Sequence, residues 1–102
     1  MSLEDLARKA RLFSNPVRLR ILGLLTSGPK HVYAIAKEIN QSYPLTYLYM
    51  TSLEKAGLVK SVMVEHEQDE RKRKVYRLED FRLEISAEAI ASLMEKEKGG
   101  EA

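Results

Sequence analysis

The densest charged feature of the sequence is a run of four consecutive cations, Arg71, Lys72, Arg73 and Lys74. Such side chains pair with phosphate groups, and four phosphate contacts on B-form DNA would give a salt-dependence slope of about −3.6. Four acidic residues lie between positions 65 and 70, so a solvated face with locally cancelled charge is the alternative. We favour phosphate contact by the basic run, with the acidic residues ordering the segment when DNA is absent.

A second set of candidate contacts lies in residues 44–56. Thr46, Tyr49, Met50 and Leu53 recur at helical spacing and predict the inward face of a helix. The side chains expected to be exposed, including two residues flanking that stripe, are Tyr43, Tyr47, Leu48, Thr51, Ser52 and Lys55. Hydroxyl groups can bond phosphates or base edges, and Leu48 can contact a thymine methyl group.

This face carries only one cation, Lys55, so the sequence does not predict high selectivity for a DNA site. Packing of Tyr43 and Tyr47 against a neighbouring hairpin or another subunit is an equal alternative to DNA contact.

Four helices come first along the chain and position these residues. Ser2 and Asp5 have the spacing of a capping box and predict a helix over about 3–13. Asn15 before Pro16 predicts a second helix, which ends near Thr26. Two further helices, joined by a short turn and closed by Gly57, outline a helix-turn-helix over about 32–57.

A β-hairpin follows, over about residues 58–79. Residues 58–64 and 75–78 are rich in β-branched and aromatic side chains, whereas residues 65–74 between them are almost wholly charged. The pattern therefore predicts two strands with a long polar tip. A brief further strand is predicted at Leu83–Ile85, and Ser86 starts a last helix over about 87–98.

Three segments resemble the motifs of ArsR-type winged-helix transcription regulators. They are Leu12-Phe13-Ser14-Asn15-Pro16-Val17-Arg18-Leu19-Arg20-Ile21-Leu22, Leu53-Glu54-Lys55-Ala56-Gly57-Leu58-Val59 and Arg73-Lys74-Val75-Tyr76-Arg77-Leu78. Each motif is weak alone, but together they occur in the family's order across residues 10–80. The resemblance implies an α+β, mainly α fold, a single winged helix-turn-helix domain over 1–102 with about five helices and a β-hairpin wing.

The two terminal helices, about 3–13 and 87–98, carry apolar stripes outside the helix-turn-helix. The stripe residues are Leu3, Leu6, Ala10, Phe13, Ile90, Leu93 and Met94. In a monomer these stripes would have to cover one another. The resemblance implies instead that they pair two protomers, which places two recognition helices one DNA turn apart.

The sequence has few features of a metal-binding protein, an enzyme or a membrane protein. The sequence has no cysteine and only two distant histidines, His31 and His66, so we expect no metal site. It carries no phosphate-binding glycine loop and no hydrolase or metalloprotease motif, so we expect no catalytic residue and no cofactor. The absence of a secretion signal or a long apolar run predicts a cytoplasmic protein with no membrane partner.

The sequence therefore predicts a homodimeric transcription regulator that binds double-stranded DNA with some sequence preference. The alternative is a winged helix that contacts other proteins of the transcription or chromatin machinery without reading DNA. The net charge of +2 conceals a polarity that suits DNA binding. Residues 1–64 carry nine basic and four acidic groups, whereas residues 79–102 carry three basic and seven acidic groups.

Overall fold

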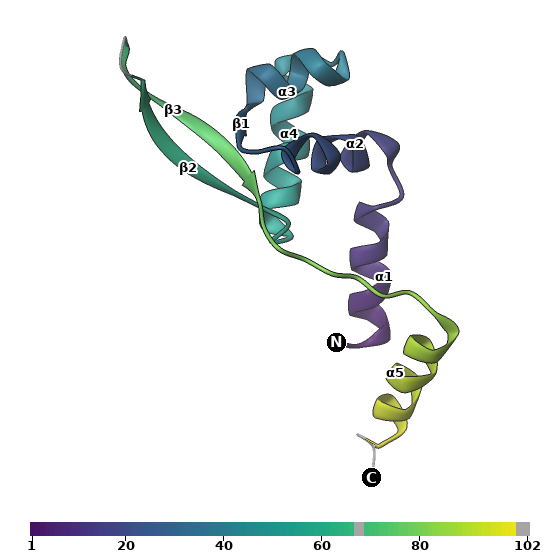
Figure 1. Ribbon diagram of the computed structural model, residues 1–102. Coiled ribbons are helices and arrows are strands. Elements are labelled where there is room, and N and C mark those ends of the chain that lie inside the picture. Colours follow the sequence, from purple (N-terminus) through teal and green to yellow (C-terminus); the bar gives the residue numbers. More distant parts are fainter. Residues whose placement is uncertain (67–68, 100–102) are drawn as a thin grey trace.

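Five helices and a three-stranded sheet make up the described part of the computed structural model, which covers residues 1–66 and 69–99 (Figure 1). The side chains of residues 65–73 lie outside that description. In chain order the elements are α1 (Leu3–Leu12), α2 (Pro16–Leu25), β1 (Lys30–His31), α3 (Val32–Ile39), α4 (Tyr43–Lys55), β2 (Val59–His66), β3 (Asp69–Leu78) and α5 (Ala87–Gly99). Helices α3 and α4 form the helix-turn-helix, and β2 and β3 form the wing.

The helix ends follow the capping chemistry of the sequence. At α1 the predicted capping box is confirmed, since Ser2 and Asp5 exchange side-chain and backbone hydrogen bonds of 3.1 Å. The Asn15 side chain accepts from the Val17 amide at 2.9 Å and caps α2 before Pro16. Helix α4 ends where Gly57 adopts a φ of 80°, a left-handed conformation that glycine takes without a Cβ clash.

The sheet has the strand order β1-β3-β2, with both pairs antiparallel. Strands β2 and β3 continue through most of the charged segment, so the polar tip is shorter than the sequence predicts. The backbone ladder can continue there because its hydrogen bonds do not depend on side-chain polarity. Strand β1 was not predicted, because its two residues are too few to show a period-2 pattern.

The predicted strand at Leu83–Ile85 is wrong. Residues 79–86 have no strand assignment, and Ile85 is 58% exposed. Alternating apolar residues form a strand only beside a partner strand, and the described sheet lies elsewhere in the fold (Figure 1).

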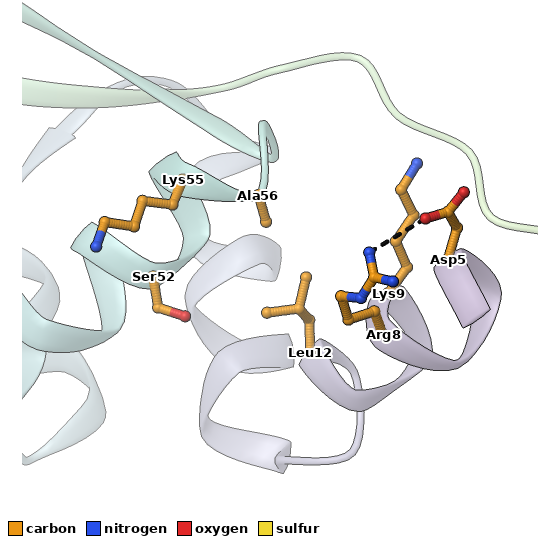
Figure 2. Close-up of a pocket in the computed structure, with 7 residues that line it drawn as sticks. All are labelled: Asp5, Arg8, Lys9, Leu12, Ser52, Lys55 and Ala56. Carbon is orange, nitrogen blue, oxygen red and sulfur yellow. Dashed lines mark hydrogen bonds and ion pairs between the residues drawn. The ribbon is translucent and has the colours of Figure 1, made fainter. Parts of the chain in front are cut away.

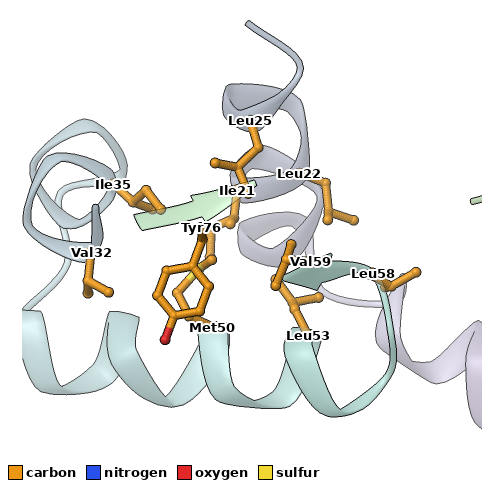
Figure 3. Close-up of a cluster of buried hydrophobic side chains, with 10 residues drawn as sticks. All are labelled: Ile21, Leu22, Leu25, Val32, Ile35, Met50, Leu53, Leu58, Val59 and Tyr76. Carbon is orange, nitrogen blue, oxygen red and sulfur yellow. The ribbon is translucent and has the colours of Figure 1, made fainter. Parts of the chain in front are cut away.

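The hydrophobic core lies where α2, α3 and α4 meet the base of the wing (Figure 3). Its buried members are Ile21, Leu22, Leu25, Val32, Ile35, Met50, Leu53, Leu58, Val59 and Tyr76. Tyr76 of β3 is fully buried, and its ring reaches from the sheet toward α4. The core thus fixes β3 against the helix that presents the candidate contact residues.

The molecule is elongated because the wing and α5 extend from this core in different directions (Figure 1). Its radius of gyration is 17.2 Å and its extents are 62 × 24 × 22 Å, whereas a compact domain of about 100 residues has a radius near 13 Å. The extended residues 79–86 carry α5 past α1, and none of the residues of α5 is buried. The terminal helices therefore form an arm that leaves the winged core.

Candidate nucleic-acid interface

The outer side of α4 is open to solvent. Thr46, Met50 and Leu53 are buried against the core, as the sequence predicts for its inward face, whereas Leu48 on the opposite side is 64% exposed. Helical periodicity places Pro44, Thr51 and Lys55 on the same outward ridge as Leu48. The helix thus presents a ridge that is mostly uncharged, with its single cation at the C-terminal end.

Tyr43 and Tyr47 lie along the flank of α4 that faces the wing. Their rings are stacked, with centroids 6.5 Å apart and planes inclined by 15°. Both remain accessible, at 51% and 40% exposure. The two tyrosines therefore form an aromatic surface beside the outward ridge.

Lys74 of the basic run joins the wing to this aromatic surface. Its ammonium nitrogen lies 5.7 Å from the ring centre of Tyr47 and 5.4 Å from that of Tyr76. Cations at this range are attracted to the face of an aromatic ring. The side chain is partly buried, so Lys74 packs between β3 and α4.

The charges around Lys74 reinforce this contact. The Tyr76 hydroxyl forms no hydrogen bond of ordinary geometry within the described residues, but it is close enough to Lys74 to raise the pKa of that ammonium. Tyr47 and Glu54 raise it further. Burial in turn raises the pKa of the Tyr76 hydroxyl. Lys74 is therefore held in its charged form.

A second connection, which sequence reasoning missed, joins α4 to the other strand of the wing. The Glu54 carboxylate accepts hydrogen bonds from the Ser61 hydroxyl at 2.5 Å and from the Ser61 amide at 3.0 Å. These bonds, with the charge of Lys74, hold the pKa of Glu54 below its ordinary value. The sequence around Glu54 does not indicate this contact, because Ser61 becomes its neighbour only after the hairpin forms.

Two of the predicted contact residues lie in the C-terminal part of α4, next to α1, and one of them, Lys55, also ends the outward ridge. Ser52 and Lys55 line a groove of about 330 Å³ whose opposite wall is α1 (Figure 2). The other residues of the groove are Asp5, Arg8, Lys9, Leu12 and Ala56. Asp5 forms a 3.1 Å ion pair with Arg8 there. The structure therefore separates Ser52 from Tyr43 and Tyr47.

Several hydroxyl groups of α4 are engaged by their own helix. Thr51, a predicted contact residue, donates to the Tyr47 carbonyl at 2.9 Å, and Thr46 donates to the Ser42 carbonyl at 2.8 Å. Ser42 accepts from the Leu45 amide at 3.3 Å as the helix cap. Fewer hydroxyl hydrogens than the sequence suggests are therefore available to a ligand on this helix.

The side chains of Arg71, Lys72 and Arg73 lie outside the described residues. The backbone of β3 includes all three, and Arg73 and Lys72 pair in register with Val64 and Glu65 of β2. Their contact with phosphate stays a prediction.

The apolar stripes of α1 and α5 are covered by the rest of the chain to different extents. Leu6 is buried and Phe13 contacts Phe81, with ring centroids 5.7 Å apart, so part of the α1 stripe is covered within the protomer. Leu3 and Leu93 line one small hollow between α1 and α5. Ile90 and Met94 remain 41% and 39% exposed. The α5 stripe is thus only partly covered by its own chain.

His31 has a structural role at the start of α3. Its Nδ1 accepts a hydrogen bond from the Ala34 amide at 3.2 Å, and its backbone pairs with Val75 in the β1–β3 ladder. Among the described residues no three histidine, aspartate or glutamate side chains gather as metal ligands would. In that part of the chain no helix has the length and apolar character needed to span a membrane.

The fold and the open α4 surface beside a wing define a winged helix-turn-helix protein. The family model of the PadR-like transcriptional regulators matches residues 21–81. An HTH-type transcriptional regulator of Methanocaldococcus jannaschii is 36% identical over 97 residues, covering 95% of this chain and 100% of the relative. The chain belongs to the PadR-like family of transcriptional regulators.

Solved structures agree with this class. A homodimeric winged helix-turn-helix DNA-binding domain of a possible ArsR-family regulator from Mycobacterium bovis is 26% identical, with a TM-score of 0.60 over 95% of this chain and 78% of that one. A PadR family regulator from Clostridium difficile, 21% identical, has the same fold, with a TM-score of 0.56 over 83% and 86% of the two chains. The ArsR-like resemblance of the sequence is confirmed at the level of the winged-helix class, and PadR-like is the family shown.

Proposed function

We propose that the chain regulates transcription as a homodimer that binds double-stranded DNA, with α4 in the major groove and the wing on the adjacent backbone. The observation that carries this proposal is the open ridge of α4, fixed to the base of the wing through Lys74 and Glu54. A helix fits the major groove, and a β-ribbon beside it can reach phosphates.

The arm formed by α1 and α5 supports the homodimer. Helix α5 has 13 residues and none of them is buried, and isolated helices of that length are marginal in water. The half-exposed Ile90 and Met94 offer an apolar surface for a second copy. The Mycobacterium bovis relative is described as homodimeric. A two-fold pair would set two α4 helices about 34 Å apart, one turn of DNA.

Charge polarity supports an orientation in which the winged core faces DNA. The core and wing hold the basic excess of the chain, whereas residues 79–102 are acidic. An acidic arm would be repelled by phosphates and is best placed on the far side of the dimer.

Two measurements on the full chain test this proposal. The mass in solution, from gel filtration with light scattering at micromolar concentration, should equal that of two chains. The binding constant for duplex DNA, measured across salt concentrations, should fall as salt rises, with a log–log slope of several units. A monomer would contradict the homodimer, and a salt-independent constant would contradict phosphate binding.

A protein-contact module is the second candidate, and one observation favours it. The outward ridge of α4 carries one cation, Lys55, whereas a helix that reads DNA usually offers several polar or cationic side chains. The same salt titration separates the two candidates, because protein contact through an apolar ridge depends weakly on salt.

As part of this proposal, we expect the regulator to act in the cytoplasm and to carry neither a catalytic residue nor a cofactor. Its site residues would be the contact and dimer residues already described, with Lys74 holding the wing to α4 instead of contacting phosphate.

A further inference from the structure

We propose that α4 selects DNA sites rich in A·T pairs through contact with thymine methyl groups, with Leu48 as the principal contact. This inference rests on the proposed function and adds the class of sequence that the regulator prefers. It is carried by the side chains that the fold leaves free at the N-terminal half of α4.

Recognition helices contact base edges mainly through their N-terminal residues. In α4 that part presents Tyr43, Pro44, Leu45, Tyr47 and Leu48, all exposed and all without charge. Lys55 lies two turns further on and lines the groove beside α1. The surface placed best for bases is therefore apolar and aromatic.

The chemistry of the base edges indicates which base this surface would contact. Guanine is read by Arg or Lys, adenine by Asn or Gln, and cytosine by Asp or Glu, whereas the thymine methyl group is read by apolar contact. The exposed N-terminal half of α4 holds none of the charged or amide side chains in that set. Thymine is the base that this surface suits.

The polar groups of α4 that already have partners within the protein are poorly placed to recognise bases by hydrogen bonding. The Thr51 and Thr46 hydroxyls donate to carbonyls of their own helix, and Glu54 is bonded to Ser61 of the wing. The phenol groups of Tyr43 and Tyr47 can still donate to phosphates, which fixes position and carries no sequence information.

The aromatic flank is held in place before any ligand arrives. Tyr47 stacks on Tyr43 and lies against the Lys74 ammonium, so less side-chain freedom is lost when the surface meets DNA. Leu48 then stands beside a fixed ring and, at 64% exposure, is the most prominent apolar side chain of the helix.

Base analogues test this inference directly. The duplex bound most tightly in a selection from random sequences is resynthesised with deoxyuridine replacing each thymine in turn, which removes one methyl group per substitution. We expect at least one position in each half-site to weaken binding about four-fold, the effect of one buried methyl group. Replacing that thymine and its adenine by 5-methylcytosine and guanine should retain more affinity than unmodified cytosine and guanine.

A pair of matched variants assigns the contact to one residue. With Leu48→Ala, duplexes containing thymine and uracil at the sensitive position should bind equally. Leu19→Ala removes an exposed leucine from α2 and leaves α4 unchanged, so it should leave the uracil effect unchanged.

Two outcomes would overturn the inference while leaving DNA binding intact. One is a salt-dependent affinity that no uracil substitution changes. The other is a uracil effect that persists in Leu48→Ala. Absence of any salt-dependent duplex binding would instead count against the proposed function itself, so the two failures are distinguishable.

Discussion

Lys74 and Tyr47 lie in contact across the junction of the wing and α4, with the ammonium nitrogen 5.7 Å from the ring centre. The lysine belongs to the basic run, but its charge is directed at two aromatic rings. Lys74 therefore holds β3 to α4.

The first prediction separates this holding role from phosphate contact. Lys74→Met should lower the free energy of unfolding by about 1 kcal/mol, because two cation–π contacts are lost. It should weaken DNA binding without changing the salt slope, which a lost phosphate contact would reduce by about 0.9. Lys60→Met, at an exposed position of β2, is the control for loss of one positive charge from the wing. A reduced slope in Lys74→Met alone would mean that Lys74 contacts phosphate.

The second prediction concerns the rest of the basic run. Replacing Arg71, Lys72 and Arg73 together with alanine should weaken binding to all duplexes to a similar degree. The salt slope should become shallower by up to about 2.7, corresponding to three phosphate contacts. Filter binding or fluorescence anisotropy at four or more salt concentrations gives the slope. If the affinity and the slope both stayed the same, the wing would not be a phosphate-binding element.

The third prediction tests the apolar stripe of α5. The double change of Ile90→Asp and Met94→Asp places two charges on the half-exposed stripe, where burial of a charge without a partner is unfavourable. Light scattering should then give the mass of one chain, and binding to a two-half-site duplex should weaken at least ten-fold. Ser92→Asp adds an acidic group on the exposed side of the same helix and should remain dimeric. Equal masses for the wild type and the double variant would exclude this interface.

The fourth prediction follows from the carboxylate of Glu54. Its pKa is lowered in the folded state by the Ser61 hydrogen bonds, so the stability that it contributes is present above its unfolded pKa and is lost as pH falls through the lower folded pKa. Glu54→Gln should therefore reduce the melting temperature at pH 7 by a few degrees, equivalent to about 1 kcal/mol. The difference from wild type should shrink as pH falls from about 5 toward 3, which thermal melts at several pH values would show. Glu38→Gln, at an exposed position of α3, serves as the comparison, and an equal pH trend in both variants would refute the assignment to Ser61.

Much of the fold follows from local signals in the sequence. Ser2 with Asp5 and Asn15 with Pro16 begin helices because their side chains or ring suit the first turn. Gly57 closes α4 because the chain there needs a positive φ. These effects operate within a few residues, which is why the sequence reveals them. Strand β1 was not predicted, and residues 83–85 were wrongly predicted as a strand, because strand formation also depends on a distant partner strand.

The candidate site was less predictable than the fold. Helical spacing identified Leu48 and Tyr47 as exposed, since that property depends only on the buried face of one helix. It could not separate Ser52, which lies beside α1, from Tyr43, which lies beside the wing. Nor could it show that Lys74 differs in environment from a free surface lysine. Its neighbour Tyr47 comes from α4, and Tyr76, two residues further along β3, is buried only once the core has packed.

The arm of the molecule makes the number of assembled dimers sensitive to the number of chains in a cell. In the proposed homodimer, α5 gains its packing from an encounter between two chains, because none of its residues is buried within one. The assembled form then depends on the square of the chain concentration wherever monomers predominate. Halving the number of chains would remove about three-quarters of the dimers in that regime, so the response of the regulated genes would be steeper than the change in copy number.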